Sequence, residues 1–326
     1  MVRKGMLWSI LAVLLIHALG APQLHALPCP ETYVAGAMKC ATSSLYVHLQ
    51  KQLVIPRVSW KKELAIFGRE NADTFLRKMK GWAPSLDATP YLASSAAPMR
   101  IKTLCNFTNG PPKFVISLCD PAERAWSHFR HEEWLWRRDS AKGKASVNTA
   151  RKGSVRHAGN ATTPSVTSRE EANSMLVESY VTCIETFVPK LKKCFTAPNG
   201  TIGHNDCFGQ MKREAAERGL EDGCLVPLAG SVYKPMLDRW LTYFPREDFL
   251  ILYKDEWLRH LDLTIDKISL HFGMRRQPNA KKPTNHITAN RHGDLSELEL
   301  PQHVQDQVKS FFEELRGWEE YIDRLP

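Results

Sequence analysis

A lysine and a cluster of hydroxyl side chains follow a short apolar segment near the start of the sequence. The stretch GAMKCATSS, residues 36–44, places Gly36 after that segment, Lys39 three residues later, and Thr42 and Ser43 where a helical pattern begins. The first turn of a helix has unpaired backbone N–H groups and a partial positive charge, which bind phosphates. The pattern predicts an anion site, although it does not fit G-x-x-x-x-G-K-[ST]. An ordinary strand–turn–helix with an exposed lysine is the alternative.

A second stretch with similar chemistry follows a continuous apolar run at 113–118, which is typical of a buried parallel strand. Asp120 begins a helix-start signal, with Pro121 in the first helical position and Glu123 in the third. The predicted helix then carries Arg124. In an open parallel sheet, ligands bind outside the carboxyl ends of the strands. We therefore expect both corners to face one crevice and to suit a ligand with anionic groups at two ends.

The elements that must position these corners alternate between strands and helices. Short apolar runs predict strands at 33–35, 113–118 and 249–253. Amphipathic patterns predict further helices at 170–192, 233–244, 262–272 and 304–322, with Gly273 as a helix stop. This alternation predicts an α/β fold with a parallel sheet covered by helices on both faces.

Length and charge set wide limits on the function. The 326 residues suffice for one large α/β domain or two smaller ones, and a hydrophobic content of 43% suits a globular core. With 44 basic and 35 acidic residues the formal net charge is +9, which favours acidic partners. The 12 histidines would add positive charge at mildly acidic pH.

Residues 1–26 read as a targeting segment. A basic start precedes a short apolar core at 6–19, and small residues follow at 18–21, which predicts a cleavable signal peptide. The apolar core is short for a membrane span, so a short signal-anchor is one alternative and a buried N-terminal helix is another. Entry into the secretory route would make three glycosylation sequons usable, at Asn106, Asn160 and Asn199.

The eight cysteines would then meet an oxidising compartment. Cys183, Cys194, Cys207 and Cys224 lie in one region and predict two disulfides, whose connectivity stays open. A zinc site is disfavoured because no CxxC pair is present. A second regional feature is the stretch 138–169, which is rich in basic and small residues. We interpret it as a flexible basic surface insertion that either helps to hold a polyanion or is simply a solvated loop.

Taken together, these motifs resemble those of PAPS-dependent sulfotransferases, in the branch that modifies carbohydrates. Residues 36–45 resemble the family's loop for the 5′-phosphosulfate, G-x-x-K-x-G-T-[TS]-x-L. Residues 116–127 resemble its 3′-phosphate segment, L-R-[DN]-P-x-x-R-x-x-S. Between them, residues 62–67 resemble K-E-x-x-[FY]-F and residues 87–91 resemble D-x-[ST]-P-x-Y. A helix-and-strand pair at 233–252 is also similar, so the likeness spans most of residues 31–320.

This resemblance implies a three-layer P-loop-like fold with a central parallel sheet flanked by helices. It implies one sulfotransferase domain over 29–326, with PAPS (3′-phosphoadenosine 5′-phosphosulfate) as the sulfuryl donor and no metal. The residues expected to bind this donor are Gly36, Lys39, Cys40, Ala41, Thr42, Ser43, Arg124, Ser127, Tyr233, Lys281 and Lys282.

The resemblance also assigns chemical roles. Glu63 is the expected catalytic base, and Lys39 is expected to stabilise the leaving group. Lys62, Asp87 and Tyr91 are expected on the substrate side. Each assignment has a plainer alternative. Glu63 beside its lysines would form a solvated ion pair, the helix arginine would pair with a neighbouring acid, and the lysines at 281–282 would be mere loop charge.

Two departures from the family pattern leave a second function open. Ala41 stands in the place of the usual glycine, and Cys119 in the place of an arginine that contacts the 3′-phosphate. The alternative is therefore a non-catalytic glycan- or nucleotide-binding homologue. A nucleotide kinase is disfavoured because Walker A and magnesium-binding motifs are missing.

The favoured function is transfer of a sulfuryl group from PAPS to a glycan hydroxyl, with an amine as the less favoured acceptor. An anionic glycan suits the positive net charge, and no nucleic-acid partner is expected. We expect the protein in the Golgi lumen, with secretion as the alternative and an N-terminal membrane anchor left open.

Overall fold

The computed structural model describes residues 27, 29–57, 59, 61–79, 84–107, 110–141, 169–196, 210–211, 213–214, 223–281 and 298–315. The predicted signal peptide or anchor at 1–26, most of the predicted insertion, Lys282, Asn160 and Asn199 lie outside the described residues.

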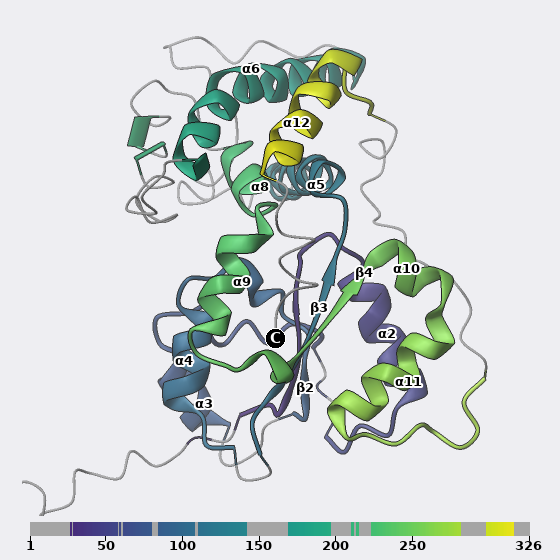
Figure 1. Cartoon of the computed structure of the whole chain (residues 1–326). Coiled ribbons are helices and arrows are strands. Elements are labelled where there is room, and N and C mark those ends of the chain that lie inside the picture. Colours follow the sequence, from purple (N-terminus) through teal and green to yellow (C-terminus); the bar gives the residue numbers. More distant parts are fainter. Residues whose placement is uncertain are drawn as a thin grey trace, which may run out of the picture.

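A parallel sheet forms the centre of the described chain (Figure 1). Its strand order is β2-β1-β3-β4, and every pairing is parallel. The strands are β1 (Thr32–Gly36), β2 (Leu86–Asp87), β3 (Lys113–Leu118) and β4 (Phe249–Tyr253). All five residues of β1 are buried, and so are five of the six in β3, because helices cover both faces. The predicted parallel α/β fold is confirmed.

Two groups of helices cover the faces of the sheet (Figure 1). One face packs against α3 (Ala72–Lys78), α4 (Ala97–Leu104) and α9 (Tyr233–Leu241). The other packs against α2 (Thr42–Gln52), α10 (Lys254–Arg259) and α11 (Leu261–Phe272). On the first face, the ring of Phe114 lies 5.2 Å from that of Tyr33 and 5.2 Å from that of Trp240. These aromatic contacts fix α9 against β1 and β3.

A third group of helices packs beyond the carboxyl ends of the strands, at the top of Figure 1. It consists of α5 (Pro121–Ala141), α6 (Arg169–Thr196), α8 (Leu225–Ala229) and α12 (Gln302–Glu314). These helices share a hydrophobic cluster that includes Phe129, Tyr180 and Phe311. Because α5 follows β3 directly, it joins this helical layer to the sheet.

Most of the predicted element positions are confirmed. The Glu123 N–H donates to Asp120 Oδ1 over 2.8 Å, so Asp120 caps α5 as predicted. α11 ends at Gly273, whose φ is 63°, a conformation that suits a residue without a Cβ. The predicted insertion starts too early, because α5 continues to Ala141.

Three disulfides join described residues: Cys29–Cys105, Cys40–Cys119 and Cys183–Cys224. No described cysteine is free. The third bond falls within the predicted cysteine cluster. Disulfides of this number indicate an extracellular or secretory-pathway protein. Among the described helices, none is both long enough and apolar enough to span a membrane.

Candidate functional site

The first corner is a loop between β1 and α2 that holds two residues in left-handed conformations. β1 ends at Gly36, where the Cβ of any other residue would lie 2.6 Å from Cβ of Leu92, so only glycine fits. Lys39 has φ 75° and Ala41 has φ 60°. Such a conformation costs an L-residue about 1–2 kcal/mol. Glycine would avoid this cost at position 41, which explains its presence in the family pattern.

The first turn of α2 faces the loop without a competing acid. No described side chain caps this helix, and the turn contains no Asp or Glu. Thr42 is buried at the start of the helix, whereas Ser43 is exposed. The N–H groups of the turn and the positive end of the helix dipole therefore favour an anion here.

Lys39 projects among other charged groups. Burial, followed by the nearby guanidinium of Arg130, lowers the pKa of Lys39 to about 8, while Glu132 acts in the opposite direction. Lys62 and Arg124 lie close enough to lower the same pKa further. A lysine crowded by cations is poised to bind an anion, because an anion would relieve that repulsion.

Lys62 joins the predicted catalytic glutamate to the first corner. Its Nζ lies 2.6 Å from Oε1 of Glu63 and 3.3 Å from Oγ1 of Thr42. Glu63 is therefore held at the mouth of α2, with 47% of its side chain exposed. The alternative interpretation, an ion pair between Glu63 and Lys62, is therefore observed. Because Lys62 also contacts Thr42, this pair holds the Glu63 carboxylate beside the predicted anion site.

Asp87 and Tyr91 are expected on the substrate side, and their contact with the substrate stays a prediction. Both are buried, and they form a bracket under the segment that carries Glu63. Tyr91 donates to Asp87 Oδ2 over 2.9 Å and accepts from the Ile66 N–H over 2.8 Å. Asp87 Oδ1 accepts from the Leu64 N–H over 3.3 Å.

Thr89 completes the same bracket. Its Oγ1 donates to Asp87 Oδ1 over 2.6 Å and accepts from the Ala65 N–H over 2.9 Å. Burial raises the pKa of Asp87 even though these hydrogen bonds act to lower it. Asp87, Thr89 and Tyr91 of the D-A-T-P-Y stretch therefore position the neighbouring loop through its backbone.

Arg124 packs against the segment that contains α8, and its expected contact with the donor stays a prediction. It is buried, and its Nη1 donates to the Pro227 carbonyl over 3.1 Å and to Ser231 Oγ over 2.8 Å. Both partners belong to the segment of α8. These two partners hold the guanidinium in place of the alternative ion pair with Asp120 or Glu123. The positive charge of Arg124 helps to lower the pKa of Lys39, and this electrostatic effect is one contribution that it makes to the site.

Three other residues predicted to contact the donor have different surroundings. Cys40 is buried in the disulfide with Cys119, and the buried Tyr233 donates to the Cys119 carbonyl over 3.0 Å. The Lys281 carbonyl accepts from Gln52 Nε2 at the far end of α2, about 15 Å from the first turn by helical rise. For these three residues, contact with the donor stays a prediction. Ser127 lies half-buried on α5.

One face of α5 carries site residues that the sequence analysis missed. His128 is buried and lies 3.4 Å from Glu132, one turn later. Burial lowers the pKa of His128, and the hydrogen bond with His128 lowers that of Glu132, so a neutral imidazole faces a carboxylate. Burial and then Lys39 lower the pKa of His131 to about 4. The spacing of residues 124, 128, 131 and 132 places them on one helical face, a signal that the sequence contains.

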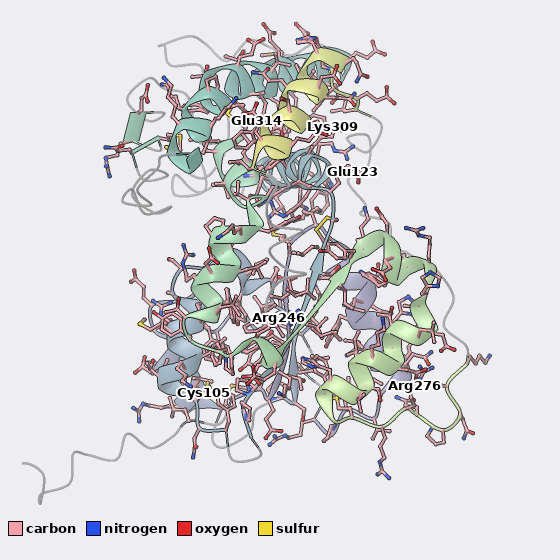
Figure 2. All side chains as sticks on the ribbon, in the orientation of Figure 1. Cys105, Glu123, Arg246, Arg276, Lys309 and Glu314 are labelled. Carbon is pink, nitrogen blue, oxygen red and sulfur yellow. A yellow bond between two sulfur atoms is a disulfide. The ribbon has the colours of Figure 1, made fainter. Side chains whose placement is uncertain are left out.

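A cavity of about 230 Å³ adjoins the second corner. The carboxyl ends of β3 and β4, the start of α5 and one side of α12 line it. Its charged lining residues are two lysines and three acids: Lys254, Lys309, Asp120, Asp255 and Glu313. Lys254 Nζ lies 3.5 Å from Oε2 of Glu123. Figure 2 shows Glu123 and Lys309 near one another where α5 meets α12. In the described part of the chain, no three metal-ligating side chains cluster into a metal site.

Comparison with known proteins identifies the fold. No protein-family model matches the chain, and no curated protein sequence does either. A crystal structure of a sulfotransferase from Alicyclobacillus acidocaldarius is similar, with a TM-score of 0.51 at 16% sequence identity. The match covers 90% of this chain and 96% of that one. At this identity the likeness shows the fold, which is the predicted three-layer arrangement around a parallel sheet.

Proposed function

We propose that this protein transfers a sulfuryl group from PAPS to a hydroxyl group of a glycan. The observation that carries the proposal is the double contact of Lys62, which bonds both to Glu63 and to Thr42 at the start of α2. This contact supports Glu63 as the proposed base beside the proposed anion site. The fold shared with a solved sulfotransferase is consistent with this chemistry.

The residues present suit a donor with phosphate groups at two ends. Lys39, Thr42 and the first N–H groups of α2 would hold the 5′ end. At the second corner Cys119 brings no charge, and the adjoining cavity carries Lys254 and Lys309 beside three acids, Asp120, Asp255 and Glu313. For the 3′-phosphate we therefore propose Arg124 and Ser127 on α5, as the resemblance implies.

PAPS supplies a sulfuryl group and a phosphate leaving group for an in-line displacement. As the acceptor oxygen bonds to sulfur and the bond from sulfur to the phosphate oxygen breaks, the acceptor proton would pass to a carboxylate oxygen of Glu63. The Lys39 ammonium would stabilise the negative charge that collects on the departing phosphate oxygen. Lys62 would orient the Glu63 carboxylate, or would move to an acidic group of the acceptor.

An anionic glycan, such as a glycosaminoglycan, is the acceptor that the positive balance of the chain favours. We place the activity in the Golgi lumen or outside the cell, where the disulfides would persist. The second candidate, a binding protein without turnover, is favoured by one observation only: Cys119 sits in a disulfide where the family pattern has an arginine.

The test is incubation of the purified protein with radiolabelled PAPS and a panel of desulfated glycans. Glu63→Gln should lower the transfer rate by about 10²- to 10⁴-fold because it removes the base. It should leave affinity for adenosine 3′,5′-bisphosphate nearly unchanged. Lys39→Ala should lower both the rate and the affinity.

Matched controls come from the same elements. Glu70→Gln changes an exposed glutamate near Glu63, and Lys51→Ala changes an exposed lysine at the other end of α2; both should behave as wild type. Nucleotide binding without transfer to any glycan would favour the non-catalytic candidate. Transfer that survives both Glu63→Gln and Lys39→Ala would reject the proposed mechanism.

A further inference from the structure

We propose that the Cys40–Cys119 disulfide is a positioning device that locks the two phosphate-binding corners together. The inference rests on the proposed function, because it assigns a role to residues within that same site. The bond links the loop after β1 directly to the end of β3, with the two Cα atoms 5.4 Å apart. It therefore fixes the spacing between the two places where the ends of one ligand would bind.

The loop around Cys40 needs such a restraint. Its neighbours in sequence, Lys39 and Ala41, both have positive φ values although neither is glycine. Conformations of this kind persist only where the surrounding structure determines them from several directions. Lys39 carries the charge of the proposed site, so any relaxation of this loop would move that charge.

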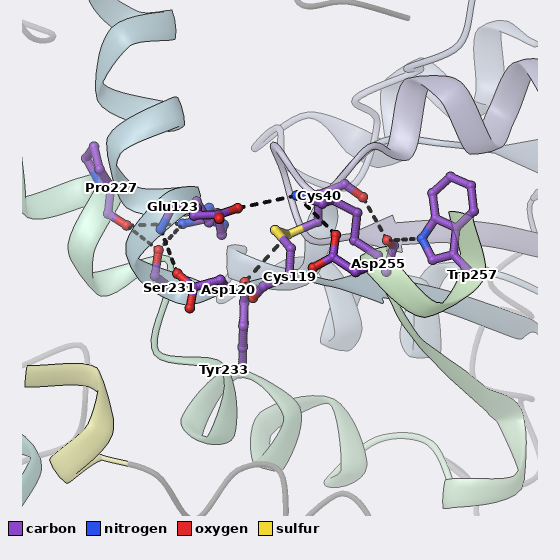
Figure 3. Close-up of a disulfide and its surroundings, with 12 residues drawn as sticks. Cys40, Cys119, Asp120, Glu123, Pro227, Ser231, Tyr233, Asp255 and Trp257 are labelled. Carbon is purple, nitrogen blue, oxygen red and sulfur yellow. Dashed lines mark hydrogen bonds and ion pairs between the residues drawn. A yellow bond between two sulfur atoms is a disulfide. The ribbon is translucent and has the colours of Figure 1, made fainter. Parts of the chain in front are cut away.

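Contacts from three other elements converge on the bond (Figure 3). Ser117 Oγ of β3 donates to the Cys40 carbonyl over 2.7 Å and accepts from Trp257 Nε1 of α10 over 2.9 Å. Tyr233 of α9 donates to the Cys119 carbonyl and lies 3.5 Å from Cys40 Sγ. Both sides of the bond are thus held by buried groups.

The residue type at position 119 determines how the second corner could bind a phosphate. An arginine there would bind the 3′-phosphate directly, whereas a cysteine in a disulfide supplies no charge. The bond instead holds the backbone at the start of α5, where Asp120 caps the helix and the adjoining cavity begins. Preorganisation of the corner replaces part of the affinity that direct contact would provide.

Cys29–Cys105 supplies a matched control within the same chain. Its sequence separation is 76, against 79 for Cys40–Cys119, so removing either bond has nearly the same effect on the unfolded chain. Figure 2 shows Cys105 at the opposite end of the sheet from Glu123, which starts α5. A general loss of stability would therefore appear in both double variants, and a loss of site geometry in only one.

The experiment compares wild type with two double variants, Cys40→Ala with Cys119→Ala and Cys29→Ala with Cys105→Ala. We measure affinity for adenosine 3′,5′-bisphosphate and amide hydrogen exchange of residues 37–44 in the free protein. The first variant should weaken the affinity about tenfold or more and speed exchange of the loop. The second should change the affinity by less than about twofold at a similar loss of thermal stability.

Each outcome decides the proposal. If the loop exchanges faster in the first variant but the wild type binds no nucleotide, the positioning role is supported and the proposed function is rejected. Equal affinities and equal loop exchange in both variants overturn the positioning role. The pair Cys40→Ser with Cys119→Ser is measured alongside, because it keeps the side-chain volume. If neither variant at 40 and 119 folds while the control does, the bond serves folding and the proposal is also overturned.

Discussion

Lys39 is the residue on which the charge of the site depends, and its pKa of about 8 makes that charge sensitive to pH. Burial disfavours the ammonium form, and Arg130 adds repulsion. The charged form is present below the pKa and is lost as pH rises through it. Affinity for adenosine 3′,5′-bisphosphate should therefore fall between pH 7 and pH 9, by about fivefold to tenfold for the loss of one charge-assisted hydrogen bond.

The variant Lys39→Arg provides the control, because a guanidinium stays protonated across this range. Its affinity should change much less between the same two pH values. Titration calorimetry of both proteins measures the difference. A wild-type affinity that is flat across the range would show that Lys39 does not contact the nucleotide.

Ala41 carries a conformational cost that a glycine would remove. Its φ of 60° lies in the left-handed region, where an L-residue is less stable by about 1–2 kcal/mol. Ala41→Gly should raise the free energy of unfolding by up to about 1 kcal/mol, since the added freedom of glycine in the unfolded chain offsets part of the gain. Chemical denaturation measures it. Ala229→Gly, within α8, should destabilise instead, and equal losses in both variants would contradict the argument.

At the scale of single elements, the bracket formed by Asp87 and Tyr91 ties the segment of Glu63 to the sheet. Tyr91→Phe removes the hydroxyl that accepts from Ile66 and leaves buried donors without a partner. We expect a loss of about 1–3 kcal/mol in stability. We also expect a lower rate of transfer at saturating nucleotide, because the base on this segment would lose its orientation.

Tyr180→Phe is the matched control for that prediction. Tyr180 is equally buried, on α6, and among the described residues its hydroxyl has no hydrogen-bond partner. Removing that hydroxyl should leave stability unchanged or slightly raised and should not alter transfer. Unfolding curves and initial rates of the two variants make the comparison. A Tyr91→Phe protein with unchanged kinetics would remove the positioning role of the bracket.

The elements that sequence patterns predicted well are those with a strong local signal. β3 and β4 were predicted from continuous apolar runs, and the start of α5 from the Asp-Pro-x-Glu cap. β2 was missed because a strand of two residues has no periodicity, and it exists only by pairing with β1.

Contacts between distant residues were the least predictable part of the site. The two disulfides at Cys29 and Cys40 each span more than 70 residues, and no local pattern indicates such a pairing. The stretch D-A-T-P-Y was singled out by its resemblance to a family motif, but burial of Asp87 gives it a positioning role that spacing alone does not reveal. The charged face of α5 was open to prediction from helical spacing.

At the scale of the whole molecule, the proposed site lies between two separately packed regions. The sheet and its helices form two hydrophobic clusters, and the helical layer above them forms a third. α5 belongs to the upper layer and follows β3, which belongs to the sheet. The geometry of the site should therefore depend on how firmly α12 and α6 hold α5.

Phe311 of α12 tests this dependence, since it is buried in the upper cluster. Phe311→Ala should cost about 3–5 kcal/mol of stability and should loosen α5. Nucleotide affinity should fall as well, because Arg130 and Glu132 on α5, whose charges act on Lys39, would lose their fixed positions.

Leu76→Ala in α3 is the control, because it removes a fully buried side chain from a cluster on the sheet and should cost about 2–5 kcal/mol. It should leave nucleotide affinity close to that of wild type when measured well below the unfolding transition. Hydrogen exchange would locate the loosened region in each variant, with α5 and α12 affected only by the first. If both variants weaken binding to the same degree, the two regions unfold as one unit and α5 is not the element that couples the helical layer to the site.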